Sequence, residues 1–253
     1  MILLIILITS LIISSKLFSI IMLACAVVGF NELFLVKYKK RIKELDIIKI
    51  FAIISITLIT LNNIFYTLDI KVLVLFPLLL LSIPIVFYNN SETYNITDCM
   101  YILGGVYFLG FAFGNIVSLR NINIYQCIYI FIISFITDTY AYIGGMLIGR
   151  HKLTTISPKK TIEGSIIGTL MGVVAGTVYY YNVVGNMTIL KVIILSLTLT
   201  IVSEIGDLVF SSIKRHFGTK DYSNLIPGHG GILDRFDSVI YVSLCMSLLL
   251  SIL

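Results

Sequence analysis

The chain has 253 residues, of which 58% are apolar and only 12% are charged, and its mean hydropathy is +1.03. A soluble domain of this size needs far more polar surface, so the composition excludes an ordinary soluble protein. Long apolar stretches recur from end to end. The net charge of +5 fits contact with anionic lipid better than a nucleic-acid partner.

A membrane-spanning helix needs about 20 mostly apolar residues, and the sequence offers nine such stretches. We therefore predict an all-α, polytopic transmembrane protein built as one integral membrane domain. The first stretch is short and Lys16 follows it, but it lacks the basic start and cleavage site of a signal peptide, so we interpret it as half of an opening hairpin. The predicted spans are roughly 2–14, 17–36, 47–66, 70–88, 99–119, 125–149, 164–184, 188–210 and 238–253.

The basic residues give the predicted spans an orientation. If nine spans alternate, the connections after the second, fourth, sixth and eighth lie on one side of the membrane. That side holds 14 of the 18 basic residues, and the other side keeps Lys16, Lys71, Arg120 and Lys191. Because basic loops face the cytoplasm, these four connections are expected there.

The cysteines and histidines form no recognisable zinc or redox pattern. The cysteines are scattered within or at the edge of apolar stretches and are expected to be small buried hydrophobic residues. Those residues are Cys25, Cys99, Cys127, Cys245, His151, His216 and His229.

Four carboxylates fall inside predicted spans, namely Glu32, Asp138, Glu204 and Asp207. Such a group costs roughly 2.5 to 3.5 kcal/mol at the centre of a span, so each needs a partner or a wet cavity. A single one could be a structural carboxylate between helices. For Asp138, neighbouring hydroxyl groups offer that structural interpretation beside a role in a site.

The connection 206–237 is dense in glycine, aspartate and basic residues. Its carboxylates suit Mg²⁺, its cations suit polyphosphate, and its glycine-rich run 227–231 lets backbone N–H groups approach an anion. Asp234 and Asp237 are expected to share one face at the start of the last helix. A solvated loop that touches lipid headgroups is the alternative, but it does not explain four aspartates among the cations.

The connection 150–164 carries a second polar group. Thr161 is a candidate helix cap, and Gly164 would allow tight packing. Lys159 and Lys160 could grip phosphate, or they could be ordinary basic residues of a cytoplasmic loop.

The second half of the chain resembles the phosphatidate cytidylyltransferase family. The matching pattern is Ser, two residues, Lys-Arg, four residues, Lys-Asp, a spacer, Pro-x-His-Gly-Gly and Asp-Arg-x-Asp. The chain departs from the family outside this pattern. Phe210 stands where the family often has an acidic residue, Ile162 where it often has Trp, and Arg150 where a Gly-Lys pairing is usual. The fixed positions are filled by Ser211, Lys214, Arg215, Lys220, Asp221, Pro227, His229, Gly230, Gly231, Asp234, Arg235 and Asp237.

The resemblance implies a homodimer that transfers a cytidylyl group from CTP to phosphatidic acid, at a site on the cytoplasmic face of a cell membrane. It divides the chain into transmembrane helices over 1–120 and a catalytic transmembrane half over 121–253. It implies two metal ions, Mg²⁺ and a second that could be monovalent, with Asp207 and Asp234 as ligands. The implied catalytic residues are Asp207, Asp234, Lys214, Arg215, Asp221 and Asp237. The implied substrate-binding residues are Ser157, Lys159, Lys160, Glu163, Lys220, His229, Gly230, Gly231, Arg235 and Asp138.

Other functions compete with this interpretation. A CTP-dependent polyprenol or phytol kinase would transfer the γ-phosphoryl group instead, and a CDP-archaeol synthase would differ only in its lipid. A transporter would also explain intramembrane carboxylates, but it should show broken helices in paired halves. Here the polar residues gather at one end and one face.

Overall fold

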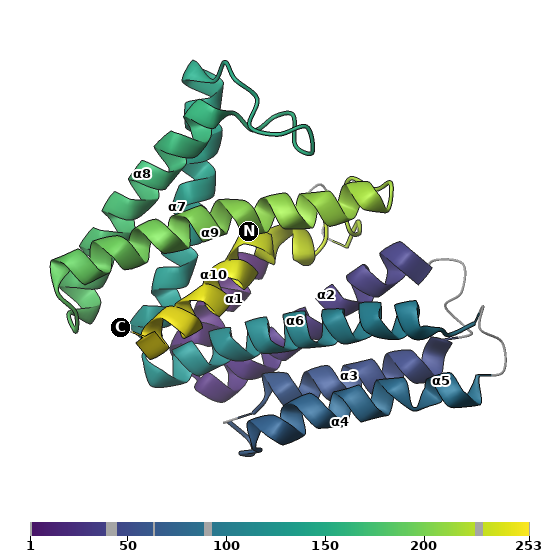
Figure 1. The fold of residues 1–253 in the computed structure, drawn as a ribbon. Helices are drawn as coiled ribbons and strands as arrows, with labels where there is room; N and C mark the ends of the chain where they lie inside the picture. Colours follow the sequence, from purple (N-terminus) through teal and green to yellow (C-terminus); the bar gives the residue numbers. More distant parts are fainter. Residues whose placement is uncertain (1, 39–44, 63, 89–92, 226–229, 253) are drawn as a thin grey trace. The chain divides into compact units, whose positions relative to one another are not determined.

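A computed structural model describes residues 2–38, 45–62, 64–88, 93–225 and 230–252, with the side chains of 2–4 left aside. In this part of the chain the structure is helical, with isolated bridges and no named strand (Figure 1). Each predicted span contains a helix, which confirms the all-α fold class. The helices are α1 (Ile2–Ile13), α2 (Ser15–Tyr38), α3 (Asp46–Thr60), α4 (Ile70–Ser82), α5 (Pro84–Phe87), α6 (Ile96–Ile122), α7 (Ile124–Ile148), α8 (Ile162–Tyr179), the π-helix η2 (Tyr180–Val184), α9 (Ile189–His216) and α10 (Leu233–Ile252).

Seven stretches in the described residues are helical, long and apolar enough to cross a membrane. They are α2, α4 with α5, α6, α7, α8 with η2, α9 and α10. The helices α1 and α3 have only 12 and 15 residues. At 1.5 Å per residue they rise about 18 and 22 Å, less than the roughly 30 Å hydrocarbon core. The chain is thus a polytopic membrane protein, and the count of nine spans stays a prediction.

The residues group into two compact units. The first consists of Met1–Ser118 with Tyr222–Ile232, and the second of Leu119–Asp221 with Leu233–Leu253. The family signature is therefore shared between the units, because its middle part, 222–232, belongs to the first and its flanks belong to the second.

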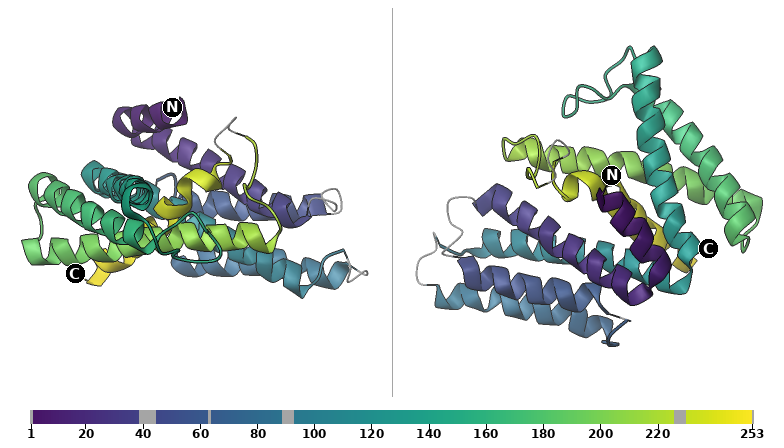
Figure 2. Two further views of the ribbon diagram at one scale, coloured as in Figure 1. Left: turned by 90° about the horizontal axis from the view of Figure 1, so that it is seen from above. Right: turned by 180° about the vertical axis from the view of Figure 1, so that it is seen from behind.

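In the first unit, α2, α3, α4 and α6 lie alongside one another (Figures 1 and 2). Tyrosine hydroxyls on α6 bond to the backbone of its neighbours: Tyr101 Oη donates to Leu33 O of α2 at 2.9 Å, and Tyr107 Oη donates to Val74 O of α4 at 2.6 Å. Such bonds satisfy polar groups inside an apolar bundle. Of the four cysteines expected to be buried, Cys25 and Cys99 of this unit and Cys127 of the second are buried, whereas Cys245 of the second is half-buried.

In the second unit, α8 packs against α7 and α9 through glycines at every fourth position. A Cβ on Gly164 would lie 2.5 Å from Ala141 O of α7, and one on Gly168 would lie 2.7 Å from Thr137 O. Glycines at this spacing let helix backbones approach closely in a membrane. The expected tight packing at Gly164 is thus confirmed. The stripe consists of Gly164, Gly168, Gly172 and Gly176.

We expect Gly168→Ala to destabilise the second unit by about 1–3 kcal/mol. The new methyl group would clash with backbone atoms of α7, which cannot shift without moving the helix. The control is Gly104→Ala in α6, where an added Cβ meets nothing within 4 Å. That change should be neutral or slightly stabilising, because Ala favours helix over Gly. Thermal unfolding in detergent measures both, and equal midpoints would contradict the packing argument.

The connection predicted over 206–237 is helical at both ends. The helix α9 continues to His216, well beyond the predicted end of the span at 210, and α10 begins at Leu233. The last turn of α9 contains Lys214, Arg215 and His216, and cations at this end of a helix are stabilised by its dipole. The basic residues that follow the apolar stretch are therefore part of the helix and do not mark its end.

Candidate active site

The loop between α7 and α8 is closed at its base by hydrogen bonds. Leu153 N–H donates to Lys160 O at 2.9 Å, and Ile162 N–H donates to His151 O at 2.9 Å. The helix α8 then starts from Thr161, whose Oγ1 accepts from Gly164 N–H at 3.2 Å, as predicted for a cap.

Glu163 fastens the same base from the first turn of α8. One of its carboxylate oxygens, Oε2, accepts from Arg150 N–H at 3.1 Å and from His151 N–H at 3.2 Å. The other, Oε1, lies 2.5 Å from His151 Nδ1. In this structure Glu163, predicted to bind substrate, thus holds the loop that carries Lys159 and Lys160.

The loop places Lys160 against α9. Lys160 Nζ lies 2.6 Å from Asp207 Oδ2, and each side chain keeps about a quarter of its surface exposed. Ser211 Oγ, one turn further along α9, donates to Asp207 Oδ1 at 3.2 Å. A predicted phosphate-binding lysine and a predicted metal ligand therefore meet directly.

A second ion pair joins α9 to α10. Lys214 Nζ lies 2.8 Å from Asp234 Oδ1, and the two side chains are only 11% and 6% exposed. Lys214 is in the last turn of α9 and Asp234 in the first turn of α10. The pair thus fixes the two ends of the signature that belong to the second unit.

Carboxylates from three helices gather around Asp207. Asp138 of α7 and Asp237 of α10 both lie close enough to Asp207 to interact with it electrostatically. Ser238 Oγ donates to Asp138 Oδ2 at 3.0 Å. Like charges at short range repel, so this cluster favours binding of cations.

Gly206 permits this approach of α9 to α10. A Cβ at that position would lie 3.0 Å from Asp237 O and 2.9 Å from Tyr241 Cβ. With no side chain there, the two helices can pack at the level of Asp207 and Asp237.

Glu204 is a further member of the neighbourhood that the sequence did not assign to the site. Its carboxylate accepts from Ser165 Oγ and, at 3.3 Å, from Thr169 Oγ1, both on α8. It also lies within electrostatic reach of Lys160 and Asp207. Its position one helical turn before Asp207 was the available signal, because residues three apart share a helix face.

Other predicted residues lie at the surface of the second unit and do not take part in the Lys160–Asp207 and Lys214–Asp234 ion pairs. Arg215 Nη1 donates to Thr219 O at 3.1 Å, while Ser157 O accepts from Lys160 N–H at 3.0 Å. The exposed residues of the predicted set are Lys159, Arg215, Lys220, Asp221 and Arg235.

The glycine-rich part of the signature belongs to the first unit. Gly230 has a φ of 81°, a left-handed conformation that favours glycine. Gly231 is buried against the carboxylate of Glu32. Three members of the motif, Pro227, Gly228 and His229, lie outside the described residues.

A metal ion is implied by the family, and the donor chemistry of the second unit is compatible with one. Asp138, Asp207 and Asp237 supply hard oxygen donors and an excess of negative charge. Among the described residues, however, no three His, Cys, Asp or Glu side chains adopt an arrangement that could hold a metal. Asp207 and Asp234 are instead paired with lysines.

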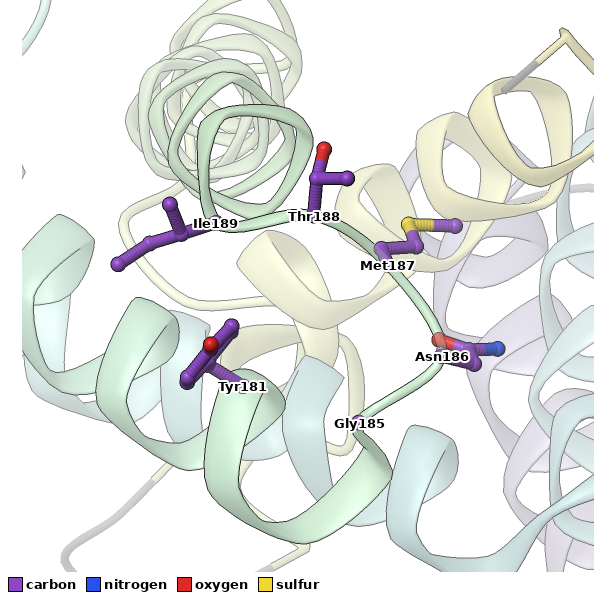
Figure 3. Close-up of a pocket in the computed structure, with 6 residues that line it drawn as sticks. All are labelled: Tyr181, Gly185, Asn186, Met187, Thr188 and Ile189. Carbon is purple, nitrogen blue, oxygen red and sulfur yellow. The ribbon is translucent and has the colours of Figure 1, made fainter.

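A surface pocket of about 660 Å³ lies elsewhere on the second unit, at the turn between η2 and α9 (Figure 3). It is lined by Tyr181 and residues 185–189 and contains none of the predicted site residues. Asp207 is 18 positions along α9 from Ile189, which is about 27 Å of helix. The pocket is therefore separate from the charged cluster.

Comparison with known proteins identifies the family. The model of the cytidylyltransferase family matches residues 1–253. A phosphatidate cytidylyltransferase of Staphylococcus haemolyticus is 37% identical over 183 residues, which is 72% of this chain and 69% of the relative. One of Staphylococcus aureus is 36% identical over 184 residues, covering 72% and 71%. The chain belongs to the cytidylyltransferase family.

Proposed function

We propose that this protein is a CTP:phosphatidate cytidylyltransferase that forms CDP-diacylglycerol and pyrophosphate in phospholipid biosynthesis. The observation that carries the proposal is the family match over the whole chain, together with the signature it contains. Relatives named phosphatidate cytidylyltransferase support the choice of substrate. The carboxylate cluster and its two lysine pairs supply a charged site suited to polyphosphate.

The reaction brings two polyanions together. A phosphate oxygen of phosphatidic acid attacks the α-phosphorus of CTP. The bond between this phosphorus and the oxygen that bridges it to the β-phosphorus breaks, and pyrophosphate leaves. A phosphate monoester loses its second proton near pH 6, so the nucleophile needs no strong general base. The protein must mainly orient both substrates and balance their charge.

The lysines are suited to that task. The ammonium groups of Lys160 and Lys214 each pair with a carboxylate in the described structure. When the substrates bind, each ammonium group could pair with a phosphate oxygen instead. The exposed residues Lys159, Arg215 and Lys220 are accessible to the triphosphate. In this proposal the carboxylates of Asp207 and Asp234 hold the side chains of Lys160 and Lys214 in place until the substrates bind.

Asp207 and Asp234 are our proposed metal ligands, with Asp138 and Asp237 as neighbouring carboxylates. When bound, Mg²⁺ would stabilise the negative charge on the α-phosphoryl oxygens and the leaving pyrophosphate. A Mg²⁺ ion, with a second ion that could be monovalent, fits the hard oxygen donors present.

The site faces the cytoplasm of a bacterial cell membrane in this proposal. The excess of basic residues in four connections supports that orientation, and the bacterial relatives support that membrane. Exposed apolar residues of α8, such as Ile166, Leu170 and Val174, are available for acyl chains or a partner subunit. The family resemblance favours a homodimer.

The position of the label in CTP tests the function. Detergent-purified protein is incubated with phosphatidic acid, Mg²⁺ and CTP labelled at either the α- or the γ-phosphorus. We expect α-label in the lipid fraction and γ-label in pyrophosphate. A lipid that carries the γ-label would instead identify a kinase, and label in neither product would contradict the proposal.

A further inference from the structure

One buried carboxylate of the first unit is not used by the mechanism above. Glu32 lies in α2 and is only 2% exposed. Its Oε1 accepts from Ser223 Oγ at 2.6 Å and from Ile232 N–H at 2.9 Å. These donors flank residues 224–231 of the signature, so one oxygen atom binds both ends of that segment.

Gly231 brings the backbone itself against this carboxylate. A Cβ at Gly231 would lie 2.6 Å from both Cδ and Oε2 of Glu32 and closer still to Oε1. No side chain fits there, and Gly231 is buried. The second glycine of the signature thus makes room for Glu32.

A membrane anchor has no need of such a group. Burying a carboxylate inside a span is expensive, and intramembrane acids are therefore functional candidates by default. Hydrogen bonds to a charged acceptor are among the stronger ones in proteins, so Glu32 can restrict the backbone that it binds. Its contacts are with a segment nearly 200 residues further along the chain.

We propose that Glu32 is a positioning residue for the signature: it holds Ser223, Gly231 and Ile232 in place and thereby prepares Gly230 and Gly231 for the nucleotide. This inference rests on the proposed function for its link to CTP. Its structural part does not, because the hydrogen bonds can be measured without turnover. Glu32 acts through the segment and does not contact the substrate.

Amide hydrogen exchange at Ile232 tests the structural part. This N–H donates to Glu32, so in Glu32→Ala its exchange should accelerate about tenfold or more. Glu32→Gln keeps an oxygen acceptor of the same size and should restore most of the protection. Should the Ala variant not survive purification, Ser223→Ala removes the hydroxyl that donates to Glu32 and accepts from Leu225 N–H at 3.2 Å, and it should accelerate exchange about threefold. Exchange at Ile232 at the rate of the unsubstituted protein in Glu32→Ala, or in Ser223→Ala where the first variant cannot be purified, would overturn the proposal.

Asp98→Asn is the matched control. Asp98 is also a buried carboxylate of the first unit, where it accepts from Tyr38 Oη at 2.9 Å and pairs with Lys37 at 3.1 Å. Its loss should leave exchange at Ile232 unchanged. Equal acceleration in Asp98→Asn would show general loosening of the unit and would overturn a specific role for Glu32.

Kinetics test the link to CTP. Glu32→Ala should raise the apparent KM for CTP about tenfold while kcat falls less than threefold, and Glu32→Gln should recover most of the affinity. Faster exchange with an unchanged KM would overturn the positioning role. If the unsubstituted protein transfers no cytidylyl group, the proposed function fails, whereas the exchange experiment still decides whether Glu32 holds the segment.

A second substitution makes the test sharper. Gly231→Ala should raise the KM for CTP when Glu32 is present, because the new methyl group meets its carboxylate. In Glu32→Ala that space is open, so the same change should add less than a twofold effect. Independent, multiplicative effects would mean that the two residues do not act together, contrary to the proposal.

Discussion

Replacing Asp207 by Asn should lower turnover roughly a hundredfold to a thousandfold while leaving the fold intact. Asn keeps the volume and an oxygen that accepts from Ser211, but it removes the charge proposed to bind Mg²⁺. Its partner Lys160 is a quarter exposed and can be solvated, so the stability should change by less than about 1 kcal/mol. Transfer of α-label from CTP to lipid measures the activity.

Thermal unfolding gives a readout that does not depend on turnover. A ligand that binds the folded state raises the unfolding temperature, so Mg²⁺ with CTP should stabilise the unsubstituted protein and stabilise Asp207→Asn much less. The control is Asp69→Asn, because Asp69 is exposed and caps α4, a role that Asn fills equally well. Near-normal activity in Asp207→Asn would refute the metal assignment.

The Lys214–Asp234 pair should behave differently, because it is buried. Asp234→Asn should abolish activity and also destabilise the protein by about 3 kcal/mol or more, since it removes the charge that pairs with the buried ammonium group of Lys214. Lys214→Met should destabilise by a similar amount. Unfolding in detergent measures these differences.

A double-substitution cycle separates the pair from its surroundings. Lys214→Met with Asp234→Leu replaces both charges by apolar groups and should recover much of the stability, though not the activity. The Lys160–Asp207 pair provides the comparison, because its side chains are more exposed and its single substitutions should cost far less. Additive losses at Lys214 and Asp234 would contradict a coupled buried pair.

The apolar runs predicted the helices well because a membrane leaves few other structures possible. The end of α9 was not predicted, since charged residues stop the hydropathy signal while favouring the last turn of a helix. Asp234, which we expected at the start of the last helix, lies in its first turn. Hydropathy reports where a chain meets lipid, and it does not report where a helix ends.

The sequence located most of the charged residues of the site but not their partners. The signature gave Asp207 and Asp234, yet the pairing of each with a lysine depends on packing between helices. Glu204 and Glu32 stood out only as acids within spans, because no motif surrounds them. The metal ligation, the substrate contacts and the division at residue 120 remain predictions.

The first unit includes a short piece of chain, 222–232, that arrives from more than a hundred positions away. Chimaeras between relatives would therefore fail if they were cut only near residue 118, since the imported helices would meet a foreign insert. Exchanging 222–232 together with 1–118 keeps Glu32 with Ser223 and Gly231, which it contacts. Segments that are joined by hydrogen bonds should therefore be exchanged together, even when they lie far apart in the sequence.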